Sequence, residues 1–211
     1  MDEKNINGLD EGTLESNKRD HKVEITDVAI SKVPFIRYRE IPEEHYETLQ
    51  ELARMVLEYS RANNDCNETA ITYSLDDPEG FTDDAGSLTI SYGDGHEVEP
   101  FTNAEAFHLM CTASGCVIIV LHNHPSLSKV SLTDVTFLLA HKAVKMVVVV
   151  TNRGGINYIV KQDSYNRMNA MKLYKEAAEK NDKANNLKER QEAADYFLNN
   201  CYKCGLIFED H

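Results

Sequence analysis

The sequence predicts an α/β protein in which a sheet is flanked by helices. Two uninterrupted apolar runs, residues 117–121 and 146–150, are typical of strands buried on both faces. Residues 43–63 carry apolar side chains at spacings of three and four, which predicts an amphipathic helix. Residues 163–200 are rich in Ala, Lys, Glu, Met and Leu, so we expect a helical segment added at the C-terminus.

Length, composition and charge indicate the number of domains and disfavour some kinds of partner. The 211 residues suit one domain plus appendages. The net charge of -13 and the pI of about 5.0 disfavour nucleic acid as a partner, because phosphate binding needs clustered Lys and Arg. No apolar run is long enough to span a membrane and the N-terminus lacks the apolar core of a signal peptide, so we expect a cytoplasmic protein.

The first part of the chain contains one strongly predicted element. Residues 1–21 are polar and without periodicity, and we expect them to form a disordered tail. Residues 23–30 alternate loosely, and residues 33–38 are a candidate for a further short strand. The helix over residues 43–63 follows Pro42, begins with acidic residues and is expected to be a wall of the core without a part in the chemistry.

A pair of strands and a second helix are predicted next. Residues 67–75 and 88–92 have the composition of strands, and the turn at residues 76–80 favours a hairpin-like pair. Thr102 and Glu105 then have the spacing of a capping box, which predicts the start of a helix that ends near a glycine.

The first of the two apolar strands ends in residues that can bind a metal. His122 and His124 are two positions apart, so in a strand both imidazoles point to the same side. Pro125 ends the strand because it has no N–H to give. Ser131 and Asp134 then form the start of a helix, with Ser131 as the cap and Asp134 in its first turn.

These side chains predict a zinc site at the carboxyl end of a central strand. Two imidazoles and one carboxylate make a three-ligand set that leaves a fourth position for water. The helix after Asp134 leads into the strand at 146–150, and Gly154 and Gly155 turn the chain into a hairpin with residues 156–160. A histidine pair without a metal, and an S-x-x-D that is only a helix cap, are the alternatives to this prediction.

The remaining histidines and cysteines carry weaker signals. His108 is expected to lie on a helix face and not to be a fourth ligand, and Cys116 is expected to be a small core residue. The five cysteines, in no regular frame, fit a reducing compartment. Cys201 and Cys204 have the spacing of half a zinc knuckle; even with His211 one ligand is missing, so two packed thiols are favoured.

The order of these motif residues resembles the JAMM zinc metallopeptidase family, also called MPN or JAB. His122-x-His124-Pro125 is followed by S-x-x-D beginning at Ser131, with six intervening positions. This gap is one residue shorter than in the deubiquitinase branch and is similar to that of bacterial and phage members with HNHP, such as RadC-type proteins. The resemblance covers roughly residues 67–161.

The resemblance implies a fold and a division into parts. It implies a central mixed sheet flanked by helices, and a JAMM-like metallohydrolase domain over residues 22–162. The tail of residues 1–21 would precede this domain, and a helical extension of residues 163–211 would follow it.

The resemblance also implies a role for each site residue. His122, His124 and Asp134 would hold Zn²⁺, and Ser131 would help to stabilise the oxyanion. A glutamate upstream would handle the proton of the attacking water, and Glu68, 54 residues before His122, is our choice for that general base.

Other assignments stay open. Glu97, Glu99 and Glu105 compete with Glu68 for the role of base. The predicted activity is zinc-dependent hydrolysis of an amide, peptide or isopeptide bond in a protein or peptide substrate, ubiquitin-like proteins included.

The alternatives to that activity are a catalytically weak JAMM-like interaction module and an accessory protein of a phage or mobile element. An HNH nuclease is disfavoured, because its motif residues are spread over a hairpin and a helix. The oligomeric state is left open.

Overall fold

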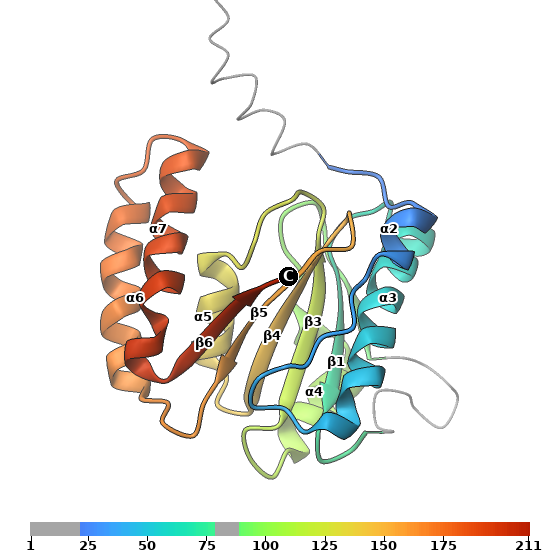
Figure 1. The fold of residues 1–211 in the computed structure, drawn as a ribbon, viewed down its shortest axis with the longest axis horizontal. Coiled ribbons are helices and arrows are strands. Elements are labelled where there is room, and N and C mark those ends of the chain that lie inside the picture. The colour runs from blue at the N-terminus through green and yellow to red at the C-terminus, as the bar shows by residue number, and fades with distance from the viewer. Residues whose placement is uncertain (1–21, 79–88) are drawn as a thin grey trace, which may run out of the picture.

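A six-stranded mixed sheet with helices on both faces forms the centre of the fold (Figure 1). The computed structural model describes residues 22–78 and 89–211, so the predicted tail of residues 1–21 lies outside the described residues, as does part of the turn predicted at 76–80. The α/β class and the flanking helices predicted from the sequence are confirmed.

The strands occur in the order β2-β1-β3-β4-β5-β6 across the sheet. Their bounds are Thr69–Ser74 for β1, Ile90–Tyr92 for β2, Ile118–His124 for β3, Val144–Thr151 for β4, Ile156–Lys161 for β5 and Leu206–Asp210 for β6. Only β3 and β4 are parallel, and the other neighbours are antiparallel. The five strands that the sequence predicts between residues 67 and 160 are therefore present.

The parallel pair explains why the apolar runs are uninterrupted. Helix α5, Leu132–Ala140, connects β3 to β4, and helices cover both faces of the two strands. Every residue of β3 is buried, including the two histidines at its end. The chain then turns back into β5, as the predicted hairpin requires.

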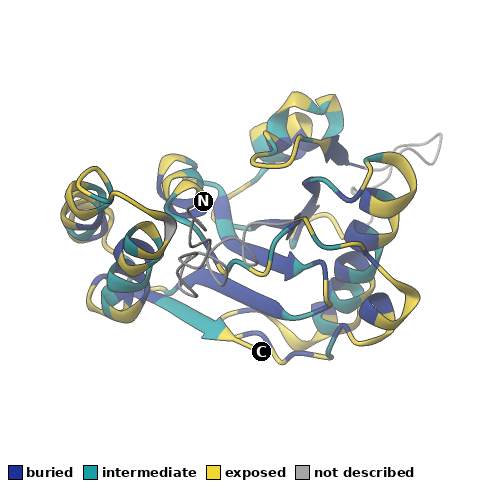
Figure 2. Cartoon of the chain, turned by 90° about the horizontal axis from the view of Figure 1, so that it is seen from above, coloured by how far each residue is buried: buried dark blue, intermediate teal, exposed yellow. Residues whose placement is uncertain are grey.

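Two apolar cores lie on opposite faces of the sheet. Helix α3, Tyr46–Asn63, packs on one face with Leu49, Leu52 and Val56, as its amphipathic pattern predicts. The other face is covered by α5, by α6, Arg167–Asn181, and by α7, Leu187–Asn200. Leu138 and Phe197 are fully buried there. In Figure 2 the strands are almost entirely buried, while the outer sides of the helices are exposed.

The prediction of two short strands near the N-terminus, at residues 23–30 and 33–38, is wrong. Helix α2, Asp27–Ser31, begins there because the Thr26 hydroxyl accepts a hydrogen bond from the amide of Ala29. Residues 33–38 form no strand; Val33, Ile36 and Tyr38 are buried as irregular chain against the α3 face, and Pro34 lacks an amide for pairing.

The predicted cap of the second helix is displaced by one residue. Helix α4, Ala104–Thr112, is capped by Asn103, whose side chain accepts hydrogen bonds from the amides of Glu105 and Ala106. Thr102 ends the short 3₁₀ turn Pro100–Thr102 instead. Asparagine is as good a cap as threonine, and the competing turn decides between them.

The C-terminal segment contains the predicted helices and one strand that was not predicted. Helices α6, Arg167–Asn181, and α7, Leu187–Asn200, are separated where the helical pattern weakens. Strand β6 then adds to the edge of the sheet beside β5, so the segment is not helical alone. Gly205 turns the chain at a φ of 75°, where a Cβ atom would lie 2.6 Å from the Ser164 backbone.

The cysteines are free thiols, and their burial differs from one part of the chain to another. Cys201 and Cys204 are buried together beside β6, while Cys116 is exposed, so its predicted place in the core is wrong. The reason is that β3 begins only at Ile118. Among the described residues, no helix is long and apolar enough to cross a membrane.

Candidate metal centre

Two histidines converge at the carboxyl end of β3. His122 and His124 lie on the α5 side of the sheet, because alternate residues of a strand share a face. Their Nε2 atoms are 3.0 Å apart, and each residue is 5% exposed. The strand predicted from the apolar run therefore directs both imidazoles to one point.

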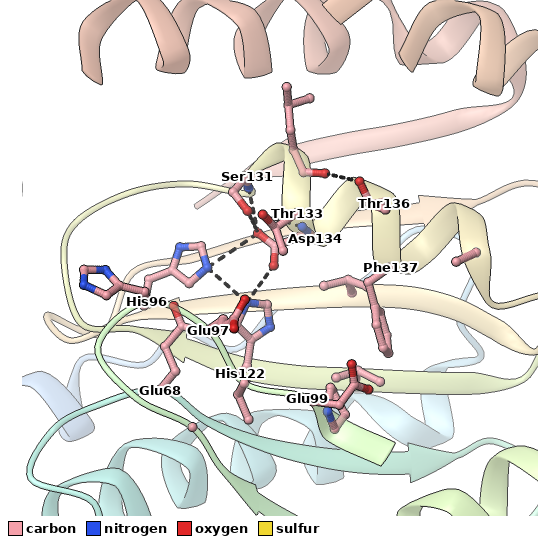
Figure 3. Close-up of a pocket in the computed structure, with 18 of the residues that line it drawn as sticks. Glu68, His96, Glu97, Glu99, His122, Ser131, Thr133, Asp134, Thr136 and Phe137 are labelled. Atoms are coloured by element: carbon pink, nitrogen blue, oxygen red, sulfur yellow. Dashed lines mark hydrogen bonds and ion pairs between the residues drawn. The ribbon is translucent and has the colours of Figure 1, made fainter. Parts of the chain in front are cut away.

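Asp134 reaches the same point from the first turn of α5. Its Oδ1 atom is 3.0 Å from His122 Nε2, and its Oδ2 atom is 3.5 Å from His124 Nε2 (Figure 3). Ligand atoms around a tetrahedral zinc ion lie about 3.3 Å from one another. The three side chains offer donor atoms that all lie within 4.8 Å of one another, so they could hold a metal ion.

Neighbouring groups orient two of the three donors. The Ser131 amide and hydroxyl donate to Asp134 Oδ2 at 2.6 and 2.7 Å, which leaves Oδ1 free to face the histidines. His124 Nδ1 lies 3.2 Å from the Ser128 carbonyl oxygen and 3.0 Å from its hydroxyl. Such bonds fix the imidazole so that Nε2 is the atom available to a metal.

The helix cap predicted at Ser131 is confirmed, and it forms a full capping box with Asp134. The Ser131 hydroxyl accepts a hydrogen bond from the Asp134 amide while it donates to the Asp134 carboxylate. A hydroxyl has a single hydrogen to donate. Ser131 therefore has to release Asp134 before it can donate to an oxyanion, and its predicted role stays a prediction.

Electrostatic coupling within the group shifts two pKa values in opposite directions. Burial alone would lower the pKa of His124, but the Asp134 carboxylate, with smaller effects of Glu68 and the Ser128 carbonyl, raises it to about 9. Burial would raise the pKa of Asp134, but His122 and His124 hold it well below its usual range. Metal binding at neutral pH therefore requires His124 to give up a proton.

Glu68 lies beside this group, immediately before β1. The register pairs Ala70 with His122 across antiparallel strands, and continuing it by two residues places Glu68 beside His124 on the same face. The residue is 7% exposed, and its carboxylate forms no hydrogen bond or ion pair with another described residue. Figure 3 shows its side chain extending from the sheet toward the group.

Burial controls the protonation of Glu68. It raises the pKa of the Glu68 carboxyl, although His122 and His124 oppose this effect. A buried carboxylate without a partner destabilises the folded chain, so such groups are rare unless they serve a function. Glu68 therefore has the environment of a general base or acid, as its proposed role requires.

The competing acidic residues are exposed or lie outside the cleft. Glu97 and Glu99 line the cleft but are exposed on the loop after β2. Glu105 lies in the first turn of α4 and does not line the cleft. His108 is exposed on α4 and is not part of the ligand group.

The group opens into a cleft with a volume of about 790 Å³. One wall is the loop at residues 93–100, and the other is formed by α5 and by Tyr174 and Asn181 of α6. No pattern in the sequence indicates that this loop or α6 lines the site. The Asp94-Gly95 pair predicts a turn, but nothing local indicates which part of the chain the turn will face.

Asn123, between the two histidines, points to the opposite face and ties the strands together. Its Oδ1 accepts from the amide of Thr69 at 2.8 Å, and its Nδ2 donates to Asn152 Oδ1 at 2.8 Å and to Ser60 Oγ at 3.2 Å. It is fully buried. Asn123 therefore fixes the start of β1, and hence Glu68, against β3, and no sequence pattern predicts this structural role.

Asn123→Ala is expected to lower the free energy of unfolding by about 2–4 kcal/mol, because it leaves several buried polar groups without that partner. Urea unfolding followed by circular dichroism measures the change. Asn169→Ala, at an exposed position of α6, is the matched control and should change stability by less than about 0.5 kcal/mol. Equal stabilities of the two variants would contradict a structural role for Asn123.

Comparison with protein-family models, with curated proteins and with solved structures finds no match for this chain.

Proposed function

We propose that this chain is a metal-dependent hydrolase of JAMM type that uses zinc to cleave an amide, peptide or isopeptide bond. The observation that carries the proposal is the convergence of His122, His124 and Asp134 beside the buried, unpaired carboxylate of Glu68. Histidine and carboxylate ligands with one position left open are typical of catalytic zinc sites. The cleft next to them gives a substrate access.

The proposed chemistry divides between the ion and the side chains. When bound, zinc would supply a Lewis acid that polarises the scissile carbonyl and lowers the pKa of water. His122, His124 and Asp134 would hold it. Glu68 would accept a proton from the attacking water and deliver it to the leaving amine, for which its raised pKa is suited.

Ser131 would stabilise the oxyanion that develops as the water attacks the carbonyl. Its hydroxyl lies at the start of α5, next to Asp134, and would turn from the Asp134 carboxylate toward the developing oxyanion. Single donors of this kind contribute about 3–4 kcal/mol in other hydrolases. The backbone amide of Ser131 would keep Asp134 in place meanwhile.

A second candidate function is a protein-interaction module with the same fold. Met168 and Met171 of α6, and Tyr202 after α7, expose 69%, 42% and 66% of their surface. Exposed Met and Tyr side chains are enriched at interfaces. An inert site with an intact fold would favour this candidate over the hydrolase.

Elemental analysis of protein purified without added metal tests the proposal. Wild type is expected to contain about one zinc per chain, because the ligand set suits a single tetrahedral ion. His124→Ala should lose it, whereas His108→Ala, at an exposed histidine on α4, should keep it. Circular dichroism checks that all three proteins are folded. Wild type that takes up no zinc even after reconstitution would contradict the proposal.

A further inference from the structure

Carboxylates line the cleft beside the metal centre, and no Lys or Arg stands among the described residues that line it. Outside the metal centre its carboxylates are those of Asp94, Glu97, Glu99 and Asp182. None of these four forms an ion pair with another described residue, so their negative charge is not compensated within the described part of the chain.

One corner of the cleft combines a carboxylate with aromatic rings. Phe137 and His141 of the α5 region have ring centroids 4.6 Å apart, and both pack on Phe101, at 5.3 and 5.0 Å. Glu99 is held beside them because it caps the turn that contains Phe101. Figure 3 labels Glu99 and Phe137 among the residues that line the cleft.

The ring of His141 adds no positive charge to this corner at neutral pH. Burial lowers the pKa of His141, with the nearby Glu99 opposing the effect and Lys161 adding to it. The Lys161 ammonium itself donates to the His141 carbonyl from the side of β5, and Lys161 does not line the cleft. Glu99 therefore faces the cleft without a cationic partner among the described residues.

We propose that Glu99, Phe137 and His141 form a subsite for a lysine or arginine side chain, so that the cleft takes basic peptides as its substrate class. A cation over an aromatic ring is attracted by the ring, and an adjacent carboxylate adds to this attraction. The surrounding carboxylates would also attract a cationic chain from a distance and repel an acidic one.

Two further observations point to a ligand in this cleft. Glu68, more than nine-tenths buried, directs an unpaired carboxylate into it. The volume of about 790 Å³ is large enough for several side chains of a peptide. That the bound peptide is a substrate rests on the proposed function. That the cleft binds a basic peptide does not depend on it.

Fluorescence anisotropy with the Glu68→Gln chain tests the subsite without cleavage of the probe. The probes are a fluorescein-labelled glycine–serine peptide that carries arginines and the same peptide with glutamine at those positions. The arginine peptide should bind about tenfold more tightly at low salt, which corresponds to one ion pair together with one cation–π contact. This preference should weaken as salt is added.

Variants at the subsite separate it from the general negative charge of the chain. In the Glu68→Gln background, Glu99→Gln and Phe137→Leu should each reduce the preference severalfold. Glu105→Gln removes the same charge outside the cleft and should preserve it. Equal affinities for the two peptides, or a preference that Glu99→Gln leaves intact, would overturn the inference.

Hydrolysis assays on wild type, run beside the binding assay on the Glu68→Gln chain, distinguish failure of this inference from failure of the proposed function. Binding that prefers the arginine peptide, together with no hydrolysis of any peptide by wild type, leaves the subsite standing and removes the hydrolase. Hydrolysis by wild type, with no preference between the two peptides, leaves the hydrolase standing and removes the subsite. Near-UV circular dichroism of Phe137→Leu shows whether the packing around Phe101 is retained. If this packing is lost, the test depends on Glu99→Gln alone.

Discussion

Glu68→Gln is expected to keep the bound metal and to lower kcat by about a hundredfold to ten thousandfold, the usual contribution of a general base. The amide keeps the size of the side chain but cannot accept a proton. Because the ligands His122, His124 and Asp134 are unchanged, zinc content should equal that of wild type. The turnover is measured on the peptide that wild type cleaves fastest in a mass-spectrometric screen.

The same substitution should raise the melting temperature of the metal-free chain at neutral pH. Burial raises the pKa of Glu68 in the folded state. A carboxyl with a raised folded-state pKa makes its full contribution to stability below its unfolded-state pKa, and this contribution is lost as the pH rises through the folded-state value. The gain from Glu68→Gln should therefore be largest above that value and should vanish in acid. Thermal unfolding in the presence of a chelator measures it.

Parallel substitutions identify the base among the acidic residues. Glu105→Gln should retain both zinc and kcat, since Glu105 lies outside the cleft. Full activity of Glu68→Gln combined with a loss in Glu97→Gln would move the base to Glu97. Full activity of Glu68→Gln in the absence of any such loss would contradict catalysis by a carboxylate of this cleft.

Asp134→Ala is expected to abolish metal binding and hydrolysis together, because it removes one of three ligands. It should also destabilise the chain by about 0.5–2 kcal/mol, the usual contribution of a helix cap, because the Ser131 amide and hydroxyl lose their acceptor. Zinc content, turnover and urea unfolding are measured on the same preparation. The loss of zinc comes from the missing ligand and the loss of stability from the missing acceptor for Ser131, so the two effects can be separated.

Asp134→Asn separates metal binding from capping. The amide oxygen of Asn can still accept from Ser131, so most of the stability should return, whereas a neutral amide is a poor zinc ligand. Thr133→Ala, next to Asp134 and exposed, is the control for substitution at the start of α5. An Asp134→Asn chain that retains zinc at full stoichiometry would contradict a carboxylate ligand at this position.

Local patterns predicted most of the fold, and the errors have physical causes. The runs in β3 and β4 are apolar throughout because helices cover both faces, and such runs are easily recognised. Strand β6 was missed because it is short and only partly buried along an edge. Residues 33–38 were wrongly assigned to a strand because of their apolar side chains. In the structure Val33, Ile36 and Tyr38 are buried in the core without strand pairing.

The candidate site was predicted in part, for similar reasons. His122, His124, Ser131 and Asp134 lie close in sequence, so their convergence follows from one strand and one capping box. The nearness of Glu68 depends on the register between β1 and β3, which no local pattern fixes. The contributions of the loop at residues 93–100 and of α6 arise only from tertiary packing.

In His122-Asn123-His124 the candidate metal site and the stability of the fold depend on different residues of the same strand end. The two histidines face the cleft, and Asn123 holds β1 and β4 from the other face. A substitution at either histidine would remove a proposed metal ligand while the network around Asn123 persisted. A substitution at Asn123 would instead weaken the pairing of the strands and, with it, the placement of both histidines.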